Sequence, residues 1–114
     1  MESKTHTLRF RIINRDIFDA IKKGKKKVET RAATEKYKSI EAGDTLRLVC
    51  GKSEFKKKIR RVKKFKSVKA MLKEYRPKDI NPRTQTAAEL EKIYANFPKY
   101  KQKLKKYGLV AMEL

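Results

Sequence analysis

The chain has 114 residues, a length that fits one domain and leaves little room for a second. It carries 33 Lys and Arg residues against 13 Asp and Glu residues, a formal net charge of +20. The hydrophobic share is 39%, but apolar residues are spread along the whole chain, which excludes a disordered basic tail and predicts a modest core. Such charge opposes compaction, and binding to a polyanion would relieve the repulsion. Nucleic acid is the first candidate partner and an anionic membrane surface the second, while a charge that serves only solubility is the alternative.

The small number of cysteine and histidine residues limits the possible disulfides and metal sites. Cys50 is the single cysteine, so an intrachain disulfide is excluded and a cytoplasmic location is expected. His6 is the single histidine and falls in an N-terminal segment, residues 1–6, that we expect to be flexible. We therefore expect neither a metal site nor a cofactor. No apolar run approaches the ~20 residues of a membrane span, and we expect no membrane partner.

The first half of the chain predicts a strand, a helix and two further strands. Apolar and polar residues alternate over residues 7–13, which is the period of a half-buried strand. Asn14 is placed to cap the helix that follows, and Gly24 is placed to end it. The next strands cover residues 25–31 and 45–50, with a helical or turn segment over residues 34–40 and a turn over residues 42–44 between them.

Residues 55–65 are ambiguous. Phe55, Ile59, Val62 and Phe65 are spaced by four, three and three positions, which taken alone indicates a basic amphipathic helix. A strand would need a bulge between Ile59 and Val62 to keep both side chains inward. The spacing leaves both structures open.

The rest of the chain predicts helices and a closing strand. Ser67 is placed to cap a helix, and Pro77 and Pro82 bracket a loop. Residues 86–89 have the capping-box pattern of a second helix. That helix places Leu90, Ile93, Tyr94 and Phe97 on one side, residues 98–106 are helical, and residues 108–114 form a strand. The order of elements predicts an α+β fold with a small mixed or closed sheet and helices on its outside.

Basic residues gather in three clusters that could contact phosphates. A single cluster is better explained by a solvated face, but three clusters in one small domain favour phosphate binding. The clusters are Lys22, Lys23, Lys25, Lys26 and Lys27; Lys56, Lys57, Lys58, Arg60, Arg61, Lys63, Lys64 and Lys66; and Lys99, Lys101, Lys103, Lys105 and Lys106. Aromatic residues are interleaved with these charges, and stacking on an aromatic ring is the usual way to hold an unpaired base. Most of the aromatic residues are needed for the core, and Tyr37 is the candidate base contact.

Residues 24–31 (GKKKVETR) are the most informative stretch. In a strand, Glu29 and Arg31 point to the same face and Thr30 to the other. Lys26 sits in the turn that enters the strand. A lysine, a carboxylate and a guanidinium would then line one mouth, and the alternative is a plain surface ion pair of little energetic worth.

This stretch matches the G-x-K-x-x-E-x-R signature of ASCH domains, which are related to PUA-like β-barrels, at Gly24, Lys26, Glu29 and Arg31. The resemblance extends to the preceding helix, to Gly43 and Asp44, and to the closing strand, and it covers residues 7–114. It implies a single domain over residues 7–114, built as a small PUA-like mixed β-barrel of about five to six strands with flanking helices. It also implies that residues 55–65 form a strand.

The resemblance further implies an RNA-binding cleft without catalysis. Lys26 and Arg31 would hold phosphate or a base carbonyl, and Glu29 would accept hydrogen bonds from a base edge or hold Lys26 in place. The candidate nucleic-acid-binding residues are Lys25, Lys26, Lys27, Glu29, Arg31, Tyr37, Lys57, Arg60, Arg61, Lys63 and Lys64. The expected partner is single-stranded or structured RNA or a nucleoside ligand. Repulsion between copies of the positively charged chain favours a monomer.

The alternative function is a hydrolase that acts on RNA or on a modified nucleoside. Some members of the family are similar in layout but remove the acetyl group of N4-acetylcytidine with a Lys, a Thr nucleophile and a Glu. Lys26 falls on that lysine, but Glu29 stands where the nucleophile would be, and Thr30 is its neighbour. In a ribonuclease, Lys26 and Glu29 would be the catalytic acid and base.

Overall fold

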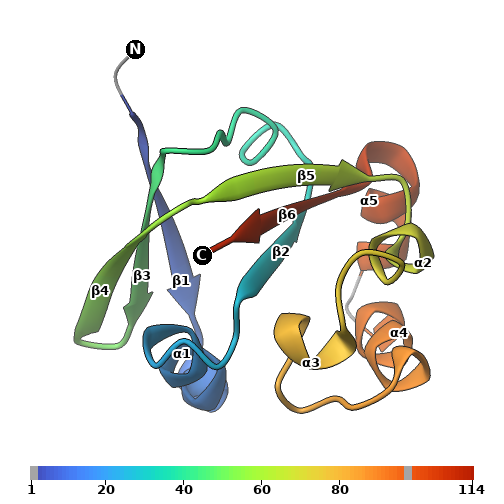
Figure 1. Cartoon of the computed structure of the whole chain (residues 1–114), viewed down its shortest axis with the longest axis horizontal. Coiled ribbons are helices and arrows are strands. Elements are labelled where there is room, and N and C mark those ends of the chain that lie inside the picture. The colour runs from blue at the N-terminus through green and yellow to red at the C-terminus, as the bar shows by residue number, and fades with distance from the viewer. Residues whose placement is uncertain (1–2, 97–98) are drawn as a thin grey trace.

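The computed structural model describes residues 3–96 and 99–114. Within them lie six strands in two three-stranded sheets, five α-helices and one 3-10 helix (Figure 1). The strands are β1 (Thr5–Phe10), β2 (Val28–Ala32), β3 (Thr45–Cys50), β4 (Ser53–Lys58), β5 (Arg61–Phe65) and β6 (Leu109–Glu113). The helices are η1 (Ile12–Asn14, 3-10), α1 (Arg15–Lys22), α2 (Val68–Met71), α3 (Pro77–Ile80), α4 (Ala87–Asn96) and α5 (Tyr100–Tyr107).

The two sheets are separate in their backbone pairing. The first has the order β1-β3-β4, in which β1 runs parallel to β3 and β4 antiparallel to it. The second has the order β2-β6-β5 and is antiparallel throughout. The α+β class with six strands is therefore confirmed, but the strands of the described residues do not close into the single barrel that we expected.

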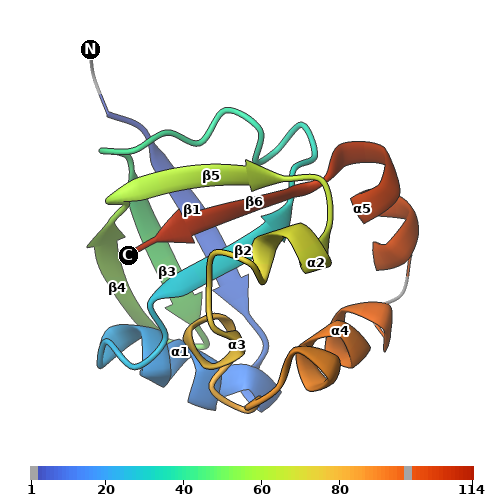
Figure 2. The ribbon, with the colours of Figure 1, turned by 45° about the vertical axis from the view of Figure 1, so that its right-hand side comes forward.

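Three layers result from this arrangement. One core lies between the two sheets and includes Leu46 and Leu48 of β3 and Met112 of β6, with Phe18 and Ile21 of α1 at its end. A second core lies between the β2-β6-β5 sheet and the helices α2 to α5, which line one side of that sheet in Figure 2. Strand β6 is thus buried on both faces, which explains why it reads as a continuous apolar run.

The N-terminal strand starts earlier than the alternation predicted and ends earlier. Strand β1 covers Thr5–Phe10, because residues 12–14 turn into the 3-10 helix η1. The backbone N–H of Lys4 donates to Asp44 Oδ1, and His6 Nε2 lies 2.8 Å from Asp44 Oδ2. Thr5 and His6, which we assigned to the N-terminal segment 1–6, thus belong to strand β1 and pair with β3, and His6 also contacts Asp44.

Residues 25–27 form a turn and not the start of a strand. The backbone N–H groups of Lys25 and Lys26 both donate to the carbonyl of Ala20, so these residues continue from the end of α1. Gly24 has φ +79°, the left-handed geometry in which a glycine ends a helix, as predicted. The strand β2 then begins at Val28.

Residues 55–65 form parts of two strands, so the helical interpretation is wrong. Strands β4 and β5 are separated by Ile59 and Arg60, and they belong to different sheets. The N–H of Ile59 donates to the carbonyl of Asp44 next to the first sheet, and that of Arg60 donates to Glu113 in the second. This break, rather than a bulge, keeps Ile59 buried and shifts the apolar spacing.

The predicted caps at Ser67 and Thr86 are confirmed, whereas Asn14 precedes α1 without a side-chain capping hydrogen bond. The connection between α2 and α4 is more structured than expected. Ser67 Oγ accepts from the N–H of Ala70, and Thr86 Oγ1 accepts from the N–H of Glu89. The proline-bracketed loop contains the short helix α3. Phe97 and Pro98, assigned to the predicted helices, lie outside the described residues. Among the described helices, none has the length and apolar character needed to cross a membrane.

Candidate functional site

A cleft of about 470 Å³ lies where strand β2 meets the ends of β1, α1 and α3 and the helices α4 and α5. Strand β2 lies between α1 and the helical layer. Side chains from the first 31 residues and from residues 80–100 therefore line the same cleft. Its lining contains Arg9, Phe10, Arg11, Asn14, Ile17, Lys26, Glu29, Thr30, Arg31, Ile80, Asn81, Arg83, Leu90, Ile93, Tyr94 and Tyr100.

Glu29 is a buried carboxylate in this cleft, 6% exposed. Its Oε1 accepts a 2.8 Å hydrogen bond from the N–H of Thr30 and lies 3.8 Å from Lys26 Nζ. Its Oε2 lies 3.9 Å from a terminal nitrogen of Arg31 but is buried without a hydrogen-bond partner among the described residues. One oxygen therefore holds the carboxylate in place, and the other is an unused acceptor.

Arg31 shares this arrangement from two positions further along β2. Its guanidinium carbon lies 5.7 Å from the centre of the Phe10 ring, and its Nε is buried without a hydrogen-bond partner in the described part of the chain. Burial alone would lower the pKa of Arg31, but the neighbouring Glu29 carboxylate and Tyr37 raise it. The guanidinium therefore stays charged, with one donor unused.

Lys26 is buried beneath the same strand, 4% exposed. Its ammonium donates to the carbonyl oxygen of Val28 at 2.7 Å and to that of Ile80. Burial lowers the pKa of Lys26, and the nearby Glu29 carboxylate opposes that shift. The side chain thus connects β2 to α3 from inside the protein.

The aromatic wall of the cleft comes from α4 and α5. The Tyr94 and Tyr100 rings are stacked, with centroids 5.7 Å apart and an angle of 25° between their planes. Tyr94 Oη and Thr30 Oγ1 are hydrogen-bonded to each other, and burial raises the pKa of Tyr94. Thr30 therefore lines the cleft as well, although strand alternation had placed it on the opposite face.

The mouth of the cleft is basic. Arg9 and Arg11 reach it from the end of β1, and Arg83 reaches it from the loop before α4. Arg83 Nε donates to Asp16 Oδ2 at 2.8 Å, and this hydrogen bond lowers the pKa of Asp16. The ion pair connects the loop to α1 across the rim.

The other predicted contact residues are dispersed. Lys25 and Lys27 line a neighbouring depression, and Arg60 and Arg61 line a third cavity beside Glu113. Tyr37 packs against the core between the sheets, with Lys36 over its ring. Lys63 pairs with Glu74, Lys64 donates to the carbonyl of Lys38, and Lys57 is half-buried in β4. The structure therefore brings together Lys26, Glu29 and Arg31 but not the rest.

Sequence reasoning missed most of the cleft lining. Tyr94 was assigned to a helix face in the core, and Arg9, Arg11 and Arg83 carried no assigned role. The alternation of residues 7–13 does place Arg9 and Arg11 on one face of the strand. That pattern could have indicated that both arginines line one surface. Tyr94 and Thr30 are separated by 64 positions, and their contact depends on the packing of α4 against β2. No group of three or more His, Cys, Asp and Glu residues suited to a metal ion occurs among residues 3–96 and 99–114.

Comparison with protein families identifies the domain. The ASCH domain model matches residues 12–114. The chain belongs to the ASCH domain family. Among solved structures it is similar to the crystal structure of hypothetical protein PH0355, with 28% identity, a TM-score of 0.80, and coverage of 96% of this chain and 95% of that one.

It is also similar to the solution NMR structure of protein PF0455 from Pyrococcus furiosus, with 28% identity, a TM-score of 0.72, and coverage of 98% of this chain and 94% of that one. No curated protein matches the chain. This ASCH domain therefore shares its fold, nearly end to end, with both of these proteins.

Proposed function

We propose that this ASCH domain binds single-stranded RNA and inserts one unpaired base into the cleft, without catalysis. The observation that carries the proposal is the pair of unused polar atoms, Glu29 Oε2 and Arg31 Nε. A buried polar atom without a partner costs roughly 1–3 kcal/mol, and such atoms in a cleft call for a ligand that would pair with them.

The chemistry of this pair fits a nucleobase. Glu29 offers an acceptor and Arg31 an adjacent donor, and the hydrogen-bonding edge of a base offers a neighbouring donor and acceptor in return. The stacked Tyr94 and Tyr100 rings supply an aromatic wall for the base face. A base edge in a duplex is already paired, so a recessed site of this kind favours an unpaired nucleotide.

The remaining charge supports RNA as the source of that nucleotide. The net charge of +20 and the arginines at the mouth suit a phosphate backbone. Lys26 is engaged by two carbonyl oxygens, which favours a bracing role over acid or base chemistry. Turnover of RNA or of N4-acetylcytidine by the wild-type protein would favour the hydrolase function instead.

The test is Glu29→Gln, with Glu35→Gln as the matched control. Glu35 is exposed and pairs only with Lys38 among the described residues, so both variants lose one negative charge. Electrostatic attraction alone would make both variants bind RNA slightly more tightly. We expect Glu29→Gln instead to weaken binding of a short single-stranded RNA and of free nucleosides about ten- to hundredfold, because an acceptor becomes a donor. Fluorescence anisotropy and calorimetry measure this, and equal affinities of the two variants would rule out the base site.

A further inference from the structure

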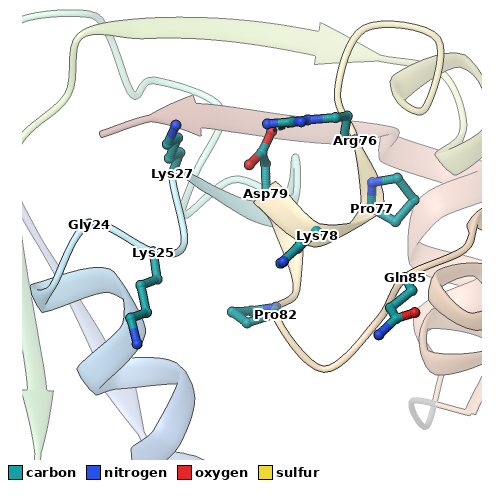
Figure 3. Close-up of a pocket in the computed structure, with 9 residues that line it drawn as sticks. All are labelled: Gly24, Lys25, Lys27, Arg76, Pro77, Lys78, Asp79, Pro82 and Gln85. Atoms are coloured by element: carbon teal, nitrogen blue, oxygen red, sulfur yellow. Dashed lines mark hydrogen bonds and ion pairs between the residues drawn. The ribbon is translucent and has the colours of Figure 1, made fainter.

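A second, wider depression of about 1070 Å³ adjoins the proposed base site. Figure 3 shows Lys25 and Lys27 on the loop along one side of it, with Arg76 and Lys78 at the start of α3 on the other. The remaining lining residues are Gly24, Pro77, Asp79, Pro82 and Gln85. Four cations and one carboxylate therefore border the depression, a formal charge of +3 from 4 − 1.

The depression shares a wall with the cleft. Lys26 and Ile80 line the cleft, whereas Lys25, Lys27 and Lys78, their neighbours in the chain, line the depression. The N–H of Lys27 donates to the carbonyl of Asp79, and the Lys26 ammonium donates to that of Ile80. These hydrogen bonds join the loop of residues 25–27 to α3. The backbone segments that carry the lysines on the two sides of the depression are therefore connected.

Several cations elsewhere in the described chain have carboxylate partners, which the lysines of this depression lack. Arg15, Arg47, Arg61, Lys63 and Arg83 each have a carboxylate within ion-pair distance. In the part of the chain that the structure describes, Lys25, Lys27 and Lys78 have none. Asp79 is the one acidic residue of the lining, and it pairs with Arg76 at 3.3 Å.

We propose that this depression binds backbone phosphates of the RNA strand whose base enters the cleft. Concave surfaces lined by one sign of charge concentrate the electrostatic field, and lysines bind phosphate as point charges. The shared wall means that a phosphate here lies one or a few nucleotides from the base site. The inference rests on the proposed function and adds Arg76 and Lys78 to the contact residues.

The first test replaces Lys25, Lys27 and Lys78 by glutamine together, with Lys52, Lys73 and Lys103 replaced as the control. The control lysines are also exposed and have no ion pair among the described residues, so the net charge falls equally. At about 0.1 M salt we expect the depression variant to bind a short single-stranded RNA about 100-fold more weakly than wild type. Its plot of log affinity against log salt should be less steep by about 2, and the control should change much less.

A second variant of the same depression should increase the affinity for RNA. Asp79→Asn removes the only carboxylate of the lining and frees Arg76, and we expect it to tighten RNA binding about fivefold. Misfolding cannot produce such a gain. Binding of free nucleosides, which carry no phosphate, should be the same in wild type and in both depression variants.

The outcomes separate this inference from the proposed function. Wild-type protein that binds RNA, with equal losses in the depression and control triple variants, would overturn the phosphate site and leave the base site standing. Wild-type protein that binds neither RNA nor nucleosides would overturn both. Loss of nucleoside binding in the lysine triple variant would also overturn the inference, because the depression would then be part of the base site.

Discussion

Two basic segments of this ASCH domain, residues 24–31 and 56–66, look alike in sequence and behave differently in the fold. The second has more charges, but the break at Ile59 and Arg60 divides them between two sheets, and Lys63 is neutralised by Glu74. The first directs Lys26, Glu29 and Arg31 into or beneath a cleft, and Lys25 and Lys27 into a depression. Density of charge along the chain therefore does not predict which cations gather around one concave surface.

The largest expected effect concerns Lys26 in the first segment. Lys26→Met would leave the Val28 and Ile80 carbonyls without their donor and Glu29 without its nearest cation. We expect the free energy of unfolding to fall by roughly 3–5 kcal/mol, measured by urea denaturation. Lys27→Met, at the exposed neighbouring position, is the control and should stay within about 0.5 kcal/mol of wild type. A loss below about 1 kcal/mol for Lys26→Met would show that the ammonium does not brace the two segments.

The second segment depends on a buried acid that lies outside it. Asp44 is 2% exposed, and its backbone carbonyl accepts from the N–H of Ile59 at the break. Burial alone would raise the pKa of this carboxyl, but hydrogen bonds from the N–H groups of Lys4 and Glu41 and from His6 outweigh it and lower the pKa to about 2. Its charged form is therefore the one that the fold favours.

Because the folded-state pKa lies below the ordinary value of 3.8, the stabilisation by Asp44 is fully present above pH 3.8. It is lost as the pH falls towards 2, and its size is about 2 kcal/mol. We expect Asp44→Asn to lower the free energy of unfolding at neutral pH and to flatten its decline between about pH 4 and pH 2. Urea denaturation over this range measures both effects, and parallel curves for wild type and variant would contradict the assignment.

The smallest effect is expected from the exposed charges of the second segment. Lys56 and Lys58 lie on β4 at exposed positions without ion pairs among the described residues. Their joint replacement by glutamine should change the free energy of unfolding by less than about 0.5 kcal/mol and leave nucleoside binding unchanged. RNA affinity should fall, but less than after neutralisation of Lys25 and Lys27. Anisotropy titrations measure the RNA affinity. A larger loss of affinity for this variant than for the Lys25 and Lys27 changes would make the outer face of β4, in the second segment, the main phosphate contact.

Local elements were predictable where a residue acts on its own neighbours. Strand β3 matches residues 45–50, and the caps at Ser67 and Thr86 form as their side-chain chemistry indicates. Residues 55–65 were not predictable from spacing, because the break at Ile59 is set by partners on two different sheets. The turn at Lys26 was predictable, but its extent was not, because the carbonyl of Ala20 on α1 accepts from the N–H groups of both Lys25 and Lys26 and β2 begins only at Val28.

By itself, the sequence determined the net positive charge, the α+β class, the family and the short signature that places Glu29 and Arg31 on one strand, since these follow from composition, period and local order. Only the tertiary structure decided that Lys26 is an internal brace, that Thr30 meets Tyr94, and that the flanking lysines face a separate depression. These features depend on contacts between residues more than 50 positions apart, whose positions are fixed by packing of the sheets and helices and not by any local pattern.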